Sequence, residues 1–119
     1  MSNKVYEIER KDSEKKVIMH FNGFMTTEAV AEFTIDYKKL IQEINTDQTT
    51  LVLDGKTLKA FPKEAEDNLM ELYKSYTVFA KIYILNPENT ITKMQVKRVL
   101  KNAGIENKFE FIDDVNQAR

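Results

Sequence analysis

Few side chains in this sequence could do catalytic chemistry. His20 is the only imidazole, and an imidazole can act as a base or as a metal ligand near neutral pH. No partner for it lies next to it in the sequence, so we expect a structural or surface histidine. Because no cysteine is present, thiol nucleophiles, disulfides and thiolate zinc sites are excluded. The glycines, Gly23, Gly55 and Gly104, lie too far apart to form a phosphate-binding loop.

Familiar arrangements of catalytic residues are missing as well. The sequence contains no Ser/His/Asp order, no paired carboxylates at a catalytic spacing and no H-E-x-x-H pattern. We therefore predict a protein that is not an enzyme, with no catalytic residue, no metal site and no cofactor.

Charged side chains are divided unevenly between two segments that we predict to be helices. Acidic residues dominate 62–76, whereas 92–103 contains no acidic residue. The second segment could dock on an acidic partner helix or on a phosphate, or it could simply be a solvated face. Its cations are Lys93, Lys97, Arg98 and Lys101.

Large apolar side chains stand in two turns that follow predicted strands. Phe24 and Met25 lie in the first turn and Phe61 lies in the second. Together they either form an exposed patch for a partner or cap the core. With the polar residues that follow Phe61, the candidate partner interface consists of Phe24, Met25, Phe61, Pro62, Lys63, Glu64 and Asp67.

Hydrophobic periodicity predicts the elements that position these side chains. Three helices are expected, and they start near Thr26, at Pro62 and at Thr92. Thr92 and Gln95 match the S/T-x-x-E/Q capping box. The five predicted strands lie in residues 5–8, 17–21, 49–53, 81–85 and 109–112. Strands joined by helices require right-handed crossovers and a largely parallel sheet.

These elements predict an α/β fold, with a single layered domain over residues 1–119 and a polar tail at 113–119. We expect a mixed, mostly parallel sheet of about five strands with an N-terminal hairpin and three main helices. The apolar runs are far shorter than the roughly 20 residues of a membrane-spanning helix, and the start lacks an apolar signal region. A cytoplasmic protein without membrane insertion is therefore expected. The net charge of −1 gives no attraction to nucleic acid.

Three stretches, taken in order, resemble a STAS domain, the sulfate-transporter and anti-sigma-factor-antagonist family. Residues 22–29 are similar to the family's Gly-x-Leu-Asp turn and first helix. Residues 51–72 are similar to its Leu-Val-Leu-Asp-Leu strand, signature turn and second helix, and 96–105 to its last long helix with a Gly-Leu ending. The resemblance spans most of residues 4–112 and implies an α/β regulatory domain.

The chain departs from the family at the signature turn. The family has Asp-Ser-Ser/Thr-Gly there, with a serine that a kinase phosphorylates, whereas this chain has Pro62, Lys63, Glu64 and Ala65. The resemblance therefore implies that no phosphosite is present at this turn. Glu64 could imitate the phosphoserine as a fixed negative charge, or it could simply stabilise the first turn of a helix.

Together these observations predict a non-catalytic STAS-like module that binds a protein partner, itself included, in a bacterial regulatory or multiprotein complex. Binding would be constitutive, without serine phosphorylation. Two alternatives stay open, which are a homo-oligomeric structural or assembly protein and a carrier of a small apolar ligand. In the second case the aromatic side chains near the sheet could line a pocket, or they could be core. They are Tyr73, Tyr76, Phe79 and Tyr83.

Overall fold

The opening segments form an antiparallel hairpin, as the sequence predicts. The computed structural model describes residues 5–59 and 61–118. Strand β1 (Tyr6–Lys11) pairs with β2 (Lys16–Gly23), and a short 3-10 turn joins them. Successive residues of β2 are buried on opposite faces of the sheet, with Met19 in one apolar cluster and Ile18 in another.

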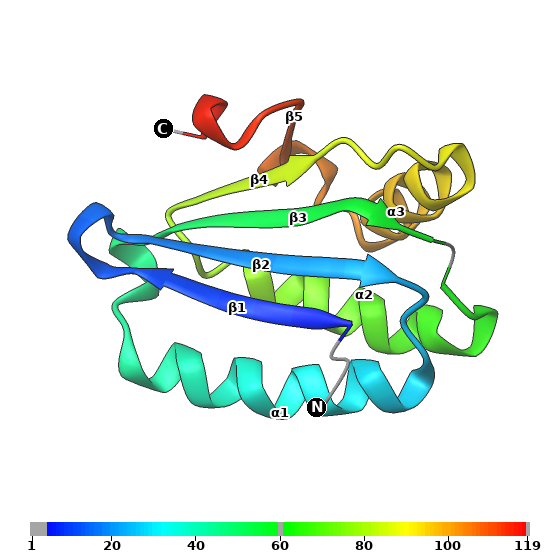
Figure 1. Ribbon diagram of the computed structural model, residues 1–119, viewed down its shortest axis with the longest axis horizontal. Helices are drawn as coiled ribbons and strands as arrows, with labels where there is room; N and C mark the ends of the chain where they lie inside the picture. The colour runs from blue at the N-terminus through cyan, green and yellow to red at the C-terminus, as the bar shows by residue number, and fades with distance from the viewer. Residues whose placement is uncertain (1–4, 60, 119) are drawn as a thin grey trace.

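The rest of the chain alternates helices and strands (Figure 1). Its elements are α1 (Thr27–Glu43), β3 (Thr50–Leu58), α2 (Glu66–Tyr76), β4 (Lys81–Leu85), α3 (Thr90–Ala103) and β5 (Glu110–Ile112). The strand order is β1-β2-β3-β4-β5, and every pair except β1–β2 is parallel. The predicted α/β fold, with a mixed five-stranded sheet and three main helices, is therefore confirmed.

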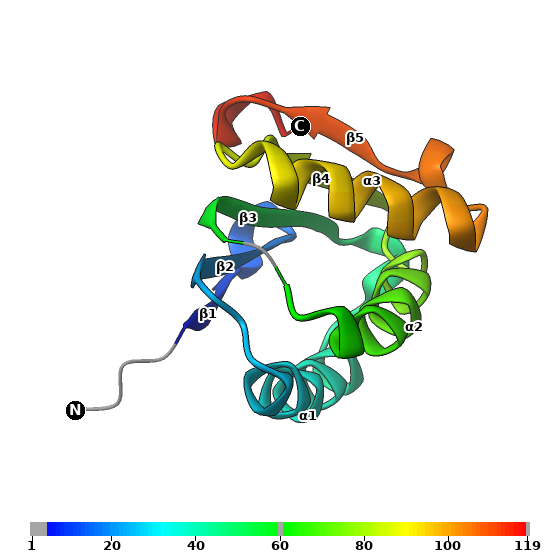
Figure 2. The same cartoon turned by 90° about the vertical axis from the view of Figure 1, so that its right-hand side faces the viewer.

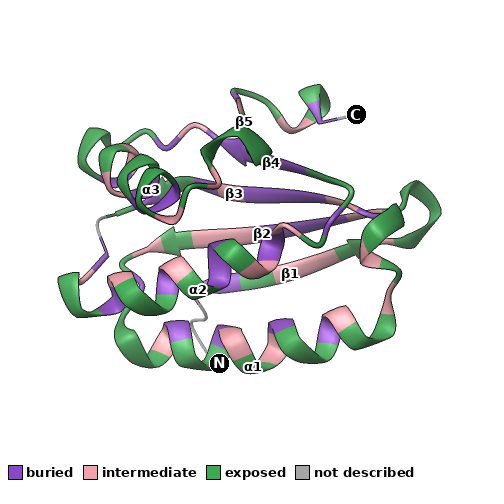
Figure 3. Cartoon of the chain, turned by 180° about the vertical axis from the view of Figure 1, so that it is seen from behind, coloured by how far each residue is buried: buried purple, intermediate pink, exposed green. Residues whose placement is uncertain are grey.

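The main core lies between the sheet and the three helices, which all cover the same face (Figure 3). Apolar side chains at alternate positions of β2 and β3 point into it, and a row of aromatic rings crosses it. Tyr37 stacks on Phe33 and makes an edge contact with Tyr76, which in turn contacts Tyr73. Tyr73, Tyr76 and Phe79 are buried, so these aromatic residues are core. Tyr83 is buried on the opposite face.

That opposite face carries a smaller apolar cluster, which the C-terminal segment covers. The cluster consists of Ile18, Val52, Tyr83, Leu85, Ile112 and Ala118. Val115–Gln117 forms a 3-10 turn, and the ammonium of Lys16 donates a hydrogen bond of 3.0 Å to the carbonyl of Ala118. The described part of the segment predicted as a polar tail is therefore packed against the sheet.

Two helix starts differ from the prediction. The N-cap of α3 is Asn89, whose side-chain oxygen accepts a hydrogen bond of 3.1 Å from the N–H of Thr92. The capping box predicted at Thr92 and Gln95 is therefore wrong, because Gln95 is used elsewhere. Pro62 stands before a 3-10 turn (Lys63–Ala65), and α2 begins only at Glu66. The predicted N-cap at Thr26 is confirmed, since its hydroxyl oxygen accepts the N–H of Ala29.

Candidate protein-interaction surface

Two turns meet at the carboxyl ends of β2 and β3, as Figure 2 shows from that side. Parallel pairing places Gly23 beside Leu58. The N–H of Lys59 then donates a hydrogen bond of 2.7 Å to the carbonyl of Gly23. The two turns that hold the candidate interface are therefore direct neighbours, as parallel strands require.

The turn after β3 is fixed to the first half of α3. The N–H of Phe61 donates to the side-chain oxygen of Gln95 at 3.0 Å, and the Gln95 amide donates back to the carbonyl of Phe61 at 3.2 Å. The buried hydroxyl of Thr92 donates to the carbonyl of Leu58 at 3.1 Å. Three side-chain hydrogen bonds thus satisfy backbone groups that a turn at the end of a strand would otherwise leave unpaired.

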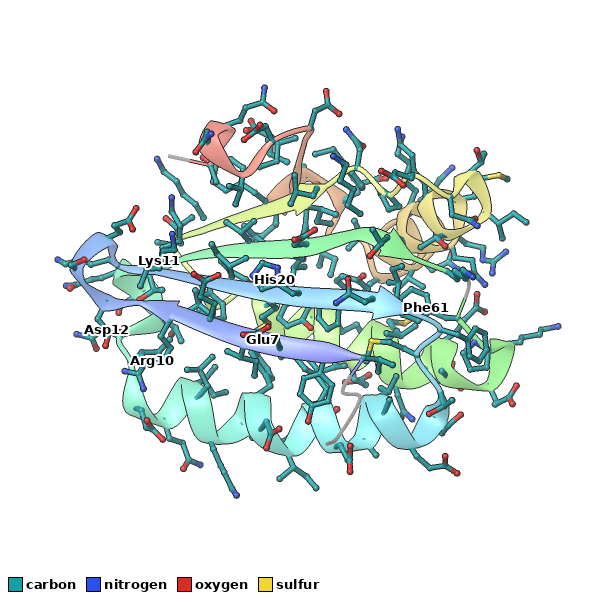
Figure 4. The ribbon with its side chains drawn as sticks, viewed as in Figure 1. Glu7, Arg10, Lys11, Asp12, His20 and Phe61 are labelled. Carbon is teal, nitrogen blue, oxygen red and sulfur yellow. The ribbon has the colours of Figure 1, made fainter. Side chains whose placement is uncertain are left out.

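The apolar residues of the candidate interface separate into core and surface. Met25 and Phe61 are only 2% and 6% exposed, so they cap the core and add little to a patch. Phe61 stands at the end of the sheet in Figure 4. Phe24 is 48% exposed. Of the expected apolar patch, only Phe24 therefore remains available to a partner.

The polar residues of the candidate interface lie around the start of α2. Lys63, Glu64 and Asp67 are exposed and Pro62 is half-buried. Among residues 5–59 and 61–118, no side chain forms an ion pair with Glu64. Phe24 is exposed in the neighbouring turn. We call these four exposed side chains the turn surface. It is defined as Phe24, Lys63, Glu64 and Asp67.

The basic helix is partly used inside the molecule. Arg98 forms an ion pair with Glu66 of α2. The ammonium of Lys97 lies 5.3 Å from the ring centroid of Phe111, within the range of a cation–π contact. Lys101 is exposed and Lys93 is half-buried. The basic charge of α3 and the acidic charge of α2 are therefore partly paired with each other inside the molecule, through Arg98 and Glu66.

His20 lies at the centre of an acidic cluster on the face of the sheet opposite the helices (Figure 4). Its Nδ1 is 2.8 Å from a carboxylate oxygen of Asp54, and its Nε2 is 3.0 Å from one of Glu9. Each ring nitrogen is within hydrogen-bonding distance of a carboxylate oxygen. If both nitrogens donate a hydrogen bond, the ring must be the doubly protonated imidazolium. The expectation of a structural histidine fits this arrangement, but sequence reasoning missed both partners.

The cluster changes the acidity of its members. Burial alone would lower the pKa of His20, but hydrogen bonds and charge from Glu9 and Asp54 outweigh it and raise that pKa above 6.5. The hydrogen bond from His20 in turn lowers the pKa of Glu9 below its ordinary value. Among the described residues, no group of three or more His, Cys, Asp or Glu side chains could hold a metal ion.

An apolar cavity lies beneath the turn surface, inside the main core. Its lining includes Met25, Phe33, Leu53, Leu58, Phe61 and Tyr76. The cavity measures about 30 Å³, whereas pockets for drug-sized ligands usually measure roughly 300–1,000 Å³. In this conformation it has room for about one water molecule. Within the described residues, no helix is both long enough and apolar enough to cross a membrane.

Comparison with known proteins finds similarity of structure. No protein-family model matches the sequence, and no curated protein sequence matches it. A structure of an uncharacterised DUF3478-family protein with a SpoIIAA-like fold, from Shewanella loihica PV-4, matches with a TM-score of 0.69 and 20% identity. That match covers 99% of this chain and 95% of the other.

A second structure is the anti-sigma factor antagonist SpoIIAA in its unphosphorylated form. It matches with a TM-score of 0.62 and 13% identity, over 94% of this chain and 91% of that chain. This chain has the strand order β1-β2-β3-β4-β5, with a single antiparallel pair at one edge and three helices on one face of the sheet. By this similarity the chain has a SpoIIAA-like fold.

Proposed function

We propose that this chain is a non-catalytic STAS-like interaction module that binds a protein partner through the turn surface, in the cytoplasm of a bacterium. The partner would belong to a regulatory or multiprotein complex. The similarity of fold to an anti-sigma factor antagonist supports a regulatory role. The observation that carries the proposal is the turn after β3, where Phe61 forms two backbone hydrogen bonds with the side chain of Gln95, one as donor and one as acceptor, beside exposed charged residues.

Binding through this surface would be constitutive. Residues 62–65 are Pro, Lys, Glu and Ala, so none offers a hydroxyl group to a kinase. The carboxylate of Glu64 already supplies a permanent negative charge near the start of α2, where the helix dipole favours it. Because Glu64 already carries its charge, binding would need no modification of this turn.

The test compares proteins captured from an extract of the source organism by three forms of the chain. Phe24→Ala combined with Glu64→Lys alters the turn surface but leaves the core residues Met25 and Phe61 in place. Ile35→Ala with Glu32→Lys likewise truncates an exposed apolar side chain and reverses a charge, on the exposed side of α1. The proposal predicts a protein that wild type and the α1 variant retain and the turn variant loses. A set of bound proteins that is identical for all three forms would refute it.

A carrier of a small apolar ligand is the second candidate, and the cavity beneath the turn surface favours it. The cavity is lined almost entirely by apolar and aromatic side chains. At about 30 Å³ it would have to open, by separation of α1 and α2 from the sheet, before it could take a lipid-sized molecule. Native mass spectrometry of freshly purified protein tests this: a co-purified apolar mass supports the carrier, and the bare chain alone argues against it.

A further inference from the structure

A groove of about 460 Å³ runs along the C-terminal half of α3, beside β5. Its lining consists of Lys97, Arg98, Leu100, Lys101, Glu106 and Phe111. The turn after β3 is attached to α3 at Gln95, in the first half of the helix. The groove is therefore a separate feature from the turn surface.

The walls of the groove carry positive charge that the chain does not neutralise. Glu66 of α2 already pairs with Arg98. Lys97 and Lys101 form no ion pair with a carboxylate in the described part of the chain, and Glu106 is the one acidic side chain in the lining. Two exposed ammonium groups one helical turn apart are a site for a pair of carboxylates.

The floor of the groove is apolar, and α3 also exposes two large apolar side chains. Leu100 and the half-buried ring of Phe111 line the floor, and the ammonium of Lys97 lies above that ring. Further along the same helix, Ile91 and Met94 are 61% and 65% exposed. They are the most exposed large apolar side chains among the described residues. Ile91 to Lys101 extends over about 15 Å of helix.

This combination identifies the class of ligand. Inorganic phosphate would satisfy the two lysines but would leave the apolar floor and the exposed Ile91 and Met94 uncovered. Nucleic acid binding requires many neutralised phosphates, and this chain has a net charge of −1. An anionic membrane surface attracts clusters of about four to eight cations. Of the four cations of α3, Arg98 is already paired with Glu66, and Glu106 and Glu110 stand at the groove or beside it. A segment that alternates carboxylates with apolar side chains fits all of these features.

We propose that this groove and the adjoining outer face of α3 bind an acidic, apolar-bearing segment of a protein partner. The segment lays carboxylates against Lys97 and Lys101, and apolar side chains against Phe111, Ile91 and Met94. This site goes beyond the turn surface, because it adds a second contact along α3 through residues that the turn surface does not include. A partner can then hold both at once, which increases its effective affinity.

The experiment selects binders from a phage-displayed library of random peptides about ten residues long, which span about 15 Å when helical. Selected peptides are titrated against wild type and three folded variants of the chain. Lys97→Glu with Lys101→Glu reverses the groove charge. Lys38→Glu with Lys39→Glu makes the same change of charge on the exposed side of α1. Circular dichroism checks that each form is folded, and Lys97→Ala with Lys101→Ala replaces the reversal if it does not fold.

The expected result is a set of peptides rich in Asp or Glu together with Leu, Phe or Tyr. Their affinity falls by about tenfold or more in the groove variant, stays unchanged in the α1 variant, and stays unchanged in the turn variant Phe24→Ala with Glu64→Lys. The last result separates this site from the turn surface. NMR shifts on peptide addition should fall on Lys97, Lys101 and Phe111.

Any of four outcomes overturns the proposal. Selected peptides could lack an excess of acidic residues, or they could bind the groove variant as tightly as wild type. Inorganic phosphate at the same concentration could shift the groove amides as strongly as the peptides do, which would identify a simple anion site. Vesicles of phosphatidylglycerol and phosphatidylcholine could bind more tightly than any peptide and lose binding in the groove variant, which would identify a membrane surface.

Discussion

The side-chain amide of Gln95 pairs with the backbone of Phe61 in both directions, as donor and as acceptor. This pair connects the first half of α3 to the turn after β3. The backbone of the turn thereby has hydrogen-bonding partners that are independent of any phosphate. The ring of Phe61 is buried in the core. This residue, which lies next to the turn surface, is therefore held both by backbone hydrogen bonds and by side-chain packing.

Gln95→Leu should destabilise the domain, because it leaves the N–H and the carbonyl of Phe61 without partners in a partly buried site. We expect a loss of roughly 1–3 kcal/mol in the free energy of unfolding, measured by urea denaturation. Gln42→Leu, at an exposed position of α1, is the matched control and should change stability by less than about 0.5 kcal/mol. Equal stability of the two variants would contradict the role of this pair.

Thr92→Val should also lower stability while preserving side-chain shape. The substitution removes the hydroxyl that donates to the carbonyl of Leu58 in a fully buried site. A loss of about 1–2 kcal/mol is expected in the same denaturation measurement. Thr90→Val, one helical position from the N-cap Asn89 and exposed, should have a smaller effect. If Thr92→Val is neutral, then the hydroxyl does not stabilise the end of β3.

The cluster around His20 should make stability depend on pH. The pKa of His20 is raised in the folded state, so its stabilising contribution is complete below the unfolded value of about 6.5. That contribution is lost as the pH rises through the raised folded pKa. As the pH rises above about 6.5, the free energy of unfolding should therefore fall more steeply in wild type than in His20→Gln. Parallel pH curves for the two proteins would rule out this coupling.

Glu9 should act in the opposite direction at low pH. Its pKa is lowered in the folded state by the hydrogen bond from His20. Its contribution is therefore present above the unfolded value and disappears as the pH falls through the lowered folded pKa. Glu9→Gln should flatten the acid side of the stability curve, and urea denaturation at a series of acidic pH values measures it. Glu7→Gln, on the same strand and exposed, is the control and should retain the wild-type slope.

The packed C-terminal segment predicts a clear difference between two neighbouring substitutions. Ala118→Glu places a carboxylate in the apolar cluster against Ile18 and Val52 and should cost roughly 1–3 kcal/mol in the free energy of unfolding. Asn116→Glu, exposed in the same segment, should be close to neutral. A free tail would tolerate both changes equally, and that result would contradict the packing of residues 113–118 on the sheet.

The fold could be predicted because its signals are local. Periodicity located α1 and β3, and the helices between strands implied the parallel sheet. The contacts at the candidate site are not local, since Gln95 and Phe61 are 34 residues apart, as are His20 and Asp54. In the sequence, Gln95 stands at the right spacing for a capping box with Thr92. Only the tertiary structure shows that its side-chain amide instead forms hydrogen bonds with the backbone of Phe61, in the turn after β3.

The burial of the turn residues could not be predicted for a related reason. Met25 and Phe61 lie outside the periodic segments, so no pattern indicates which way their side chains point. Parallel pairing of β2 with β3 brings both turns over the end of the main core, where these two side chains fill the space. Phe24, one residue before Met25, is left facing solvent.

The most direct test of constitutive binding through the turn surface is the affinity of the partner captured from the source organism. It should be titrated by calorimetry against unmodified wild type, Phe24→Ala with Glu64→Lys, and Ile35→Ala with Glu32→Lys. We predict that unmodified wild type and the α1 variant bind equally, and that the turn variant binds about tenfold more weakly or worse. Equal affinity of all three, or binding that requires prior phosphorylation of the chain, would contradict the account.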